Sequence, residues 1–276
     1  MTAKPIFSII IPTLNEMRRD NIETLLKSIS LQKNKAYEII VVDQSSDDGT
    51  VDIAKKYGAV IMNIPRPAFY TPPGVHRNTG AKAAHGDILI HLDADMELSD
   101  DGWLDRVASL IDEEHQAAII HEKDIAYGYW NKCKALERRC YWGTPMESAR
   151  IVSCKLFEQV GGYDQHISSG EDFHISELYG RHTSINQSDE VWLKHRTGST
   201  SLGALLRKKY SYGKTANVFL RASPSRLNIA KESLVAYLKH SSLLIRQPHI
   251  ACGMLVLRIL EFVAVKYGMK TVKTNI

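Results

Sequence analysis

Two pairs of neighbouring carboxylates are the residues of this sequence best suited to chemistry. Asp93 and Asp95 stand two positions apart, directly after the apolar run 88–92. Carboxylate oxygens are hard ligands that hold Mg²⁺ or Mn²⁺ while leaving coordination positions for a diphosphate. Such an ion would neutralise the charge that develops on a leaving phosphate. Because solvated aspartate pairs also follow many strands, the spacing by itself is weak evidence for a metal site.

The second pair, Glu171 and Asp172, follows Gly170. A hydroxyl nucleophile needs a base within hydrogen-bond reach while its new bond forms, and a carboxylate can be that base. The alternative is structural, since acidic residues also stabilise the first turn of a helix through the helix dipole.

The elements around these residues alternate between strand and helix patterns. Apolar or β-branched runs predict strands at 7–11, 38–42, 59–62 and 88–92, and helical patterns lie between them at 21–32, 49–57 and 75–84. Continuous apolar strands separated by helices favour a parallel sheet covered on both faces, hence an α/β fold. Such sheets bind ligands beyond the carboxyl ends of their strands. Polar segments follow the first, second and fourth strands, at 12–16, 43–47 and 93–95.

The rest of the chain gives a less regular pattern. A loop at 63–74 contains Pro65, Pro67, Pro72 and Pro73, which exclude a helix or a central strand. Helices are expected near 103–113 and 129–139 and strands near 117–121 and 191–194, and the pattern is helical from about 223 onwards. We expect a catalytic domain at 1–205, followed by a basic, amphipathic helical tail at 206–276.

Five segments, in this order, resemble the family 2 glycosyltransferases, whose fold is GT-A. They are SIIIPTLNE at 8–16, VVDQSSDDGT at 41–50, RNTG at 77–80, HLDAD at 91–95, and GGYD at 161–164 with GED at 170–172. The resemblance implies a Rossmann-like, mostly parallel sheet flanked by helices, with a nucleotide-sugar half at about 1–98 and an acceptor half at about 99–205 of the catalytic domain. It also implies a nucleotide-diphosphate sugar donor, with UDP-sugars the commonest class, and a divalent cation, Mn²⁺ or Mg²⁺.

The resemblance also assigns roles on the nucleotide side. Pro12, Thr13 and Glu16 would border the nucleotide pocket. Asp43 would accept a hydrogen bond from the base, and Arg77 would contact the base or a phosphate.

On the reaction side, Asp93 would reach the ribose or the metal, and Asp95 would bind the metal directly. Asp172 would be the base of a single-displacement, inverting transfer, with Glu171 supporting the site or the acceptor. His195, after the apolar run 191–193, stands where some family members have a further metal ligand; a structural histidine is the alternative.

Three positions depart from the family pattern. Gln44 and Ser45 replace the usual Asp and Gly, and His76 occupies a position that is usually small. These departures concern the fine geometry of the pocket and its base preference.

The net charge of +4 hides an asymmetry along the chain. Residues 206–276 contain thirteen Lys and Arg but only Glu232 and Glu261, a net charge of +11, which leaves −7 for residues 1–205. The tail also holds an apolar stretch at 250–267 that could pack on the core, on another subunit, or in a membrane interface. Basic residues favour a negatively charged leaflet. We therefore expect a cytoplasmic protein, peripheral on the inner face of the cell membrane.

Several classes are disfavoured. The four cysteines are too few and too irregularly spaced for a disulfide framework. They form no CxxC pair, so neither a zinc ribbon nor a thioredoxin-like site is indicated. The apolar run 6–11 is too short for a signal peptide, and no run of about 18 uninterrupted apolar residues predicts a spanning helix. No GxGxxG follows the first strand, as a dehydrogenase would require, and no nucleic-acid-binding module is recognised.

The leading hypothesis is therefore a metal-dependent, inverting glycosyltransferase that acts on a lipid-linked or glycan acceptor. A retaining transferase on the same fold would remove the base role from Asp172. A catalytically silent nucleotide-binding scaffold is the third hypothesis, and the three intact aspartates argue against it. The sequence leaves the sugar, the acceptor and a homo-oligomeric state open.

Overall fold

The chain is built around a mixed sheet of eight strands. A computed structural model describes residues 6–19, 21–66 and 71–273. Pro67 of the proline-rich loop lies outside these residues. The strands are β1 (Phe7–Thr13), β2 (Tyr37–Asp43), β3 (Val60–Asn63), β4 (Ile88–His91), β5 (Met96–Leu98), β6 (Ala117–Ala126), β7 (Ala149–Ser153) and β8 (Ile185–Gly198). The helices are α1 (Asn21–Ser30), α2 (Thr50–Lys56), α3 (Pro73–Lys82), α4 (Trp103–Ala108), α5 (Tyr129–Tyr141), α6 (Cys154–Gln159), α7 (Glu171–Gly180), α8 (Leu202–Ala222), α9 (Ile229–Lys239), α10 (Ser241–Arg246) and α11 (Pro248–Lys273), with 3₁₀ turns η1 (Glu16–Arg19) and η2 (Pro224–Asn228).

The strand order is β3-β2-β1-β4-β7-β6-β8-β5, and four of the seven pairings are parallel. β1 lies between β2 and β4, so the direction in which strands are added reverses beside it. This reversal is the switch point at which α/β sheets bind ligands. The polar segments after β1, β2 and β4 therefore meet at one edge of the molecule, as the sequence predicted.

Alternate residues of the central strands face two different cores. Ile9 and Val41 belong to a core completed by α1, α2 and α4, whereas Ile10 and Val42 belong to a core completed by α6 and α7. Successive side chains of a strand point to opposite faces, so a strand that is apolar throughout needs a cover on both. This arrangement confirms the α/β fold class with a mostly parallel, helix-flanked sheet.

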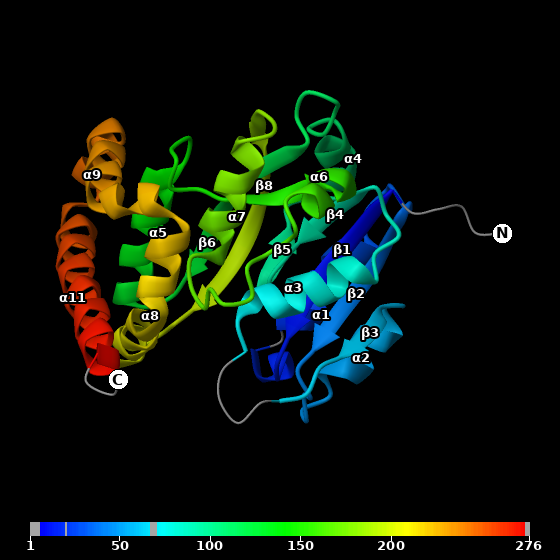
Figure 1. Ribbon diagram of the computed structural model, residues 1–276, viewed down its shortest axis with the longest axis horizontal. Helices are drawn as coiled ribbons and strands as arrows, with labels where there is room; N and C mark the ends of the chain where they lie inside the picture. The colour runs from blue at the N-terminus through cyan, green and yellow to red at the C-terminus, as the bar shows by residue number, and fades with distance from the viewer. Residues whose placement is uncertain (1–5, 20, 67–70, 274–276) are drawn as a thin grey trace.

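The C-terminal helices form a separate layer with α5, at the end of the molecule away from β1–β3 (Figure 1). A third apolar cluster joins α5 to this layer through Cys133, Leu136, Cys140, Leu205, Tyr237, Ile250, Met254 and Leu257. The helical region begins at Leu202 rather than near 223, and the expected domain boundary at 205 falls in the first turn of α8. The boundary itself stays a prediction.

One helix of the described chain has the length and apolar composition of a membrane span. It is α11, over Pro248–Thr271, and a third of its most apolar window is buried against the protein. The sequence did not predict this because Arg258, Glu261 and Lys266 interrupt the apolar run.

Candidate active site

The carboxyl ends of β1 and β2 place Thr13 and Asp43 directly opposite each other. Oδ1 of Asp43 accepts hydrogen bonds from the hydroxyls of Thr13 at 2.8 Å and Ser46 at 2.6 Å. Oδ2 accepts from the backbone N–H of Ser46 at 2.8 Å. Asp43 is only 1% exposed, so its carboxylate organises the loop after β2. Its predicted hydrogen bond to a base would be added to these protein contacts.

The loops after β1 and β2 are joined to each other. The N–H of Asn15 donates to Ser46 Oγ at 2.8 Å, and the N–H of Glu16 donates to Thr50 Oγ1 at 2.9 Å. Pro12 and Glu16 are half-buried beside these contacts. Thus Pro12, Thr13, Glu16 and Asp43 lie in one connected region, and their role as the border of a nucleotide pocket stays a prediction.

The structure accommodates the three residues that depart from the family pattern, Ser45, Gln44 and His76. Ser45 takes the left-handed conformation, φ 56°, that glycine adopts without strain, so its backbone follows a glycine-like path. Gln44 donates from its side-chain amide to Thr71 Oγ1, just before α3. His76 is buried in α3, and burial lowers its pKa, which favours a neutral imidazole.

Arg77 of α3 connects the two carboxylate pairs. Its Nη2 lies 3.0 Å from Asp93 Oδ1, and its Nη1 lies 3.0 Å from Glu171 Oε1 and 2.6 Å from Asp172 Oδ1. The guanidinium carbon also stands over the ring of Tyr163, 5.3 Å from the centroid. Burial opposes the charge of Arg77, but Asp172 and the other partners outweigh it and raise the pKa of Arg77 well above its usual value. Its predicted contact with a base or phosphate remains a prediction, because every ion pair described for it is to a protein carboxylate.

Asp93, after β4, is paired with two arginines. Besides Arg77, Arg150 of β7 places Nη2 3.1 Å from Asp93 Oδ2 and donates from Nε to Glu122 Oε1 at 2.7 Å. Burial favours the neutral acid, but Arg150 and Arg77 together hold the pKa of Asp93 well below its usual range. Asp93 is therefore ionised at every physiological pH. Nη1 of Arg150 is buried without a hydrogen-bond partner among the described residues.

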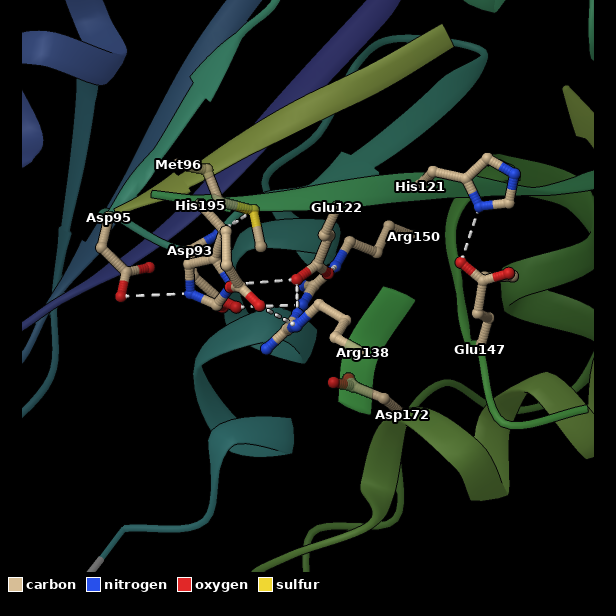
Figure 2. Close-up of polar contacts among 12 residues, drawn as sticks. Asp93, Asp95, Met96, His121, Glu122, Arg138, Glu147, Arg150, Asp172 and His195 are labelled. Carbon is tan, nitrogen blue, oxygen red and sulfur yellow. Dashed lines mark hydrogen bonds and ion pairs between the residues drawn. The ribbon is translucent and has the colours of Figure 1, made fainter. Parts of the chain in front are cut away.

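Asp95 lies beside His195, and Figure 2 shows the two side chains facing each other. Asp95 Oδ2 is 3.3 Å from His195 Nε2. The other ring nitrogen, Nδ1, lies 3.0 Å from Glu122 Oε2 and 3.4 Å from Asp124 Oδ1. The sheet fixes this arrangement, because His195 of β8 is in register with Met96 of β5 on one side and Asp124 of β6 on the other.

Arg138 of α5 balances the two β6 carboxylates (Figure 2). It contacts Glu122, and its Nε lies 3.0 Å from Asp124 Oδ2. Burial nevertheless raises the pKa of Asp124 to about 6. Since Glu122 also binds Arg150, the strand β6 links His195 to the arginines around Asp93.

Glu171 and Asp172 begin α7, and Gly170 before them packs closely against α8. Gly170 has φ 88°, and a Cβ there would lie 2.8 Å from the ring of Phe219 of α8. Both the conformation and the space therefore require glycine. Glu171 is buried, and burial together with the neighbouring Asp172 raises its pKa to about 7. Asp172 is more exposed, at 25% of its side chain.

Comparison with known proteins decides the family. The profile of "Glycosyl transferase family 2" matches residues 8–168, more than half of the chain. The chain belongs to glycosyl transferase family 2. It is therefore a glycosyltransferase that takes a sugar from a nucleotide-sugar donor.

Individual relatives agree with this assignment. Glycosyltransferase AglE of Haloferax volcanii is 29% identical over 229 residues, which are 76% of this chain and 72% of AglE. A PGL/p-HBAD biosynthesis glycosyltransferase of Mycobacterium bovis is 31% identical over 183 residues, 63% of this chain and 70% of that protein.

Solved structures share the fold. The mannosyltransferase PcManGT of Pyrobaculum calidifontis, in complex with GDP-Man and Mn²⁺, superposes with a TM-score of 0.63 at 18% identity, covering 98% of this chain and 88% of PcManGT. TarS of S. aureus, residues 1–349 in complex with UDP-GlcNAc, superposes with a TM-score of 0.55 at 16% identity, covering 98% and 92%. The GT-A fold expected from the resemblance is confirmed.

The family 2 transferase brings most of its sequence-predicted site residues into one network. Arg77, Asp93, Glu171 and Asp172 are joined directly, and Asp95 lies against His195. Sequence reasoning missed Glu122, Asp124, Arg138 and Arg150. Glu122 and Asp124 follow the predicted strand 117–121 and were open to the same polar-after-strand argument that identified Asp93. Arg150 had no such signal, because its strand was not predicted.

Within the described residues, the transferase has no group of three or more His, Cys, Asp or Glu side chains placed to share one metal ion. Asp95 and His195 nevertheless form a pair, and both are partly exposed. The surrounding network joins six carboxylates to three arginines, which leaves a charge of up to −3 when all six are ionised and His195 is neutral. A divalent cation would reduce this charge before an anionic diphosphate approached.

Proposed function

We propose that this transferase moves a sugar from a UDP-sugar to an acceptor hydroxyl with inversion of the anomeric carbon, using Asp172 as base and a divalent cation at Asp95 and His195. The observation that carries the proposal is Arg77, whose guanidinium joins Asp93 to Glu171 and Asp172. One guanidinium nitrogen contacts Asp93, which is expected near the donor, and the other contacts Glu171 and Asp172, which are expected near the acceptor.

Asp95 and His195 are the residues that fit a metal ion. Their nearest atoms are 3.3 Å apart, a separation that suits two ligands of one ion, and carboxylate with imidazole is a suitable donor set for Mn²⁺. Bound there, the ion would stabilise the negative charge of the leaving diphosphate. Asp93 supports this pair indirectly, since both of its oxygens are held by arginines.

Asp172 is better placed than Glu171 to accept the proton of the acceptor. Its side chain is more exposed than that of Glu171, 25% against 9%, so an acceptor can reach it. Arg77 fixes one of its oxygens at 2.6 Å and so orients the carboxylate. Glu171, whose pKa is about 7, then serves as a buried partner of Arg77.

The catalytic test is Asp172→Asn, which keeps the shape and removes the base. We expect kcat to fall about 10²- to 10⁴-fold, with the midpoint of thermal unfolding little changed. For the wild-type enzyme, NMR of the product is expected to show an inverted anomeric carbon. Retained configuration would remove the base role from Asp172, and unchanged turnover in Asp95→Ala would remove the metal role from Asp95.

Donor and metal are tested together by thermal unfolding with nucleotide-sugars and Mn²⁺. A ligand that binds the folded state raises its apparent stability by mass action. We expect a UDP-sugar to raise the unfolding midpoint in the presence of Mn²⁺, and expect Asp95→Asn and His195→Ala to weaken Mn²⁺ binding measured by electron paramagnetic resonance. If GDP-Man raises the unfolding midpoint and no UDP-sugar does, the donor nucleotide carries guanine and not the proposed uracil.

The acceptor is proposed to be a lipid-linked or glycan hydroxyl. This rests on the relatives, one of which is named for PGL/p-HBAD biosynthesis, and on the basic C-terminal layer. Product analysis after incubation with lipid-linked and free-glycan acceptors distinguishes the two.

A further inference from the structure

One face of α11 presents apolar side chains to solvent. The residues recur every three or four positions and therefore form a single stripe along the helix. The stripe consists of Cys252, Leu255, Val256, Ile259, Phe262, Val263 and Tyr267. The larger side chains among them are between 48% and 64% exposed.

The exposure is concentrated in this part of the molecule. Of seventeen exposed large hydrophobic residues in the described chain, ten lie between Leu234 and Tyr267. The preceding helices contribute Leu234, Val235 and Leu238 of α9 and Ile245 of α10. Scattered apolar residues on a surface need no explanation, but a contiguous set marks an interaction site.

The charges around the stripe are of one sign. Lys266 and Lys270 extend from its C-terminal end, where they line a shallow groove of about 190 Å³ with Phe262, Val263 and Tyr267. Glu261 is the only carboxylate of α11 in its described residues, and it is buried on the opposite face. Apolar chains beside ammonium groups match the boundary between acyl chains and phosphate headgroups of an anionic bilayer.

The opposite face of α11 packs against α5 and α8. Glu261 lies 3.1 Å from Lys134 of α5 and 3.8 Å from both Lys209 of α8 and Arg258. Gly213 of α8 and Gly268 of α11 let the two helices cross with their Cα atoms in near contact. Crossing a membrane would break this ionic cluster and this packing, whereas lying at the surface preserves both.

A second copy of the chain is a poorer occupant. Pairing two such faces would bring together two tails of net charge +11 each. Like charges at an interface oppose association. A negatively charged surface complements them.

We propose that α11 docks on an anionic membrane surface, with its axis along the surface and the stripe in the interfacial layer. The inference is independent of the proposed chemistry, because it uses none of the residues of the active site. Its consequence is that the transferase works at a lipid surface, where a lipid-linked acceptor is concentrated.

Cys252 allows the docking to be observed in the full chain. It is the exposed cysteine of the protein and lies on the stripe, whereas Cys133 and Cys140 are buried. With Cys154→Ser to remove the half-buried thiol, an NBD fluorophore on Cys252 would report its own environment. We expect a blue shift and brighter emission with vesicles containing phosphatidylglycerol, and a much smaller change with pure phosphatidylcholine. The same label at Leu31→Cys, in a chain carrying Cys252→Ser, is the control, since Leu31 is 62% exposed on the catalytic side.

Co-sedimentation with the same vesicles tests the stripe. Ile259→Glu with Phe262→Glu should lower the bound fraction so that the apparent Kd rises at least about tenfold. Leu31→Glu, a matched change at an equally exposed residue, should leave it unchanged. Circular dichroism melts confirm that the variants are folded.

Three results would overturn the proposal. Equal binding of the stripe variant and the Leu31 variant would place the contact elsewhere. Equal binding to neutral and anionic vesicles would remove the electrostatic part. A doubled mass in light scattering without lipid, abolished by the stripe variant, would identify a second copy as the occupant.

Discussion

At the scale of single residues, the active site is held together by ion pairs that two buried arginines make. Arg77 and Arg150 each neutralise two or more carboxylates from different elements. Removing one partner of such a pair is costly because the other charge stays buried and unpaired. The arginines therefore carry stability as well as geometry.

Arg150→Met should destabilise the fold by about 2–3 kcal/mol, since it leaves Glu122 with Arg138 as its remaining arginine and one oxygen of Asp93 without its cation. The lower end applies if Asp93, whose side chain is 35% exposed, is partly rescued by water. Arg150→Lys should recover part of the loss, because it restores the charge but not the planar fork that reaches Glu122 and Asp93 together. Urea unfolding of the three proteins checks this, and equal midpoints for the Met and Lys variants would contradict it.

Glu171 predicts a pH dependence with a definite sign. Its pKa is raised to about 7 in the folded protein, above the usual value near 4.5. The unfolded chain therefore releases this proton first, so the stability contributed by the neutral acid is present below about pH 4.5 and is lost as the pH rises towards 7. Glu171→Gln cannot ionise, so its stability relative to the wild type should increase between pH 5 and pH 8. Thermal unfolding across that range measures the difference, and a constant difference would mean that Glu171 is ionised throughout.

At the scale of elements, the first half of the sheet was predictable, whereas in the second half only the segments 117–121 of β6 and 191–194 of β8 were predicted. β1, β2, β3 and β4 are apolar runs between clear helices, so length and composition were enough. β7 contains Arg150 in five residues, and β8 is half-exposed and largely polar over its first six residues, 185–190. Their pairings with β4, β6 and β5 connect distant parts of the chain, and no local pattern encodes such pairings.

The same lack of a local sequence pattern explains why only part of the site was predicted. Residues that follow the first, second and fourth strands were found, because position along the chain fixes their place at the edge of the sheet. Their partners Arg138 and Arg150 come from α5 and β7, which tertiary packing alone brings to that edge.

The crossing of α8 and α11 gives a prediction at this scale. A Cβ at Gly213 would overlap the carbonyl of Val265 and lie 3.0 Å from Cα of Gly268. Gly213→Ala should therefore cost about 1–3 kcal/mol by forcing the helices apart. Gly203→Ala, in the first turn of the same helix, is the control, because its nearest neighbour would be a flexible arginine at 3.8 Å. Helix propensity makes that change neutral or stabilising, by up to about 1 kcal/mol. If both variants unfold at the same urea concentration, the helices do not cross this closely.

At the scale of the whole molecule, charge separates the protein into an acidic end that suits a cation and a basic end that suits an anionic surface. The two ends are nevertheless physically connected. Phe219 of α8 packs on Gly170, next to Glu171 and Asp172, and Nδ1 of His174 of α7 lies 2.9 Å from Oγ of Ser223. The helical layer is therefore part of the support of the active site.

This connection predicts the fate of the chain cut at the expected domain boundary. A protein of residues 1–205 loses Tyr237, Ile250, Met254 and Leu257, which bury the apolar face of α5. At about 1.5–3 kcal/mol for each large buried side chain, the loss is roughly 6 kcal/mol or more. That is comparable to the whole stability of a typical domain, about 5–15 kcal/mol. We expect the shortened chain to bind a hydrophobic dye, to elute as aggregates and to show no cooperative melt, whereas the full chain melts cooperatively. If residues 1–205 instead remain monomeric with a cooperative transition, α5 does not depend on the C-terminal helices. The tail would then be an appendage, as its composition alone suggested.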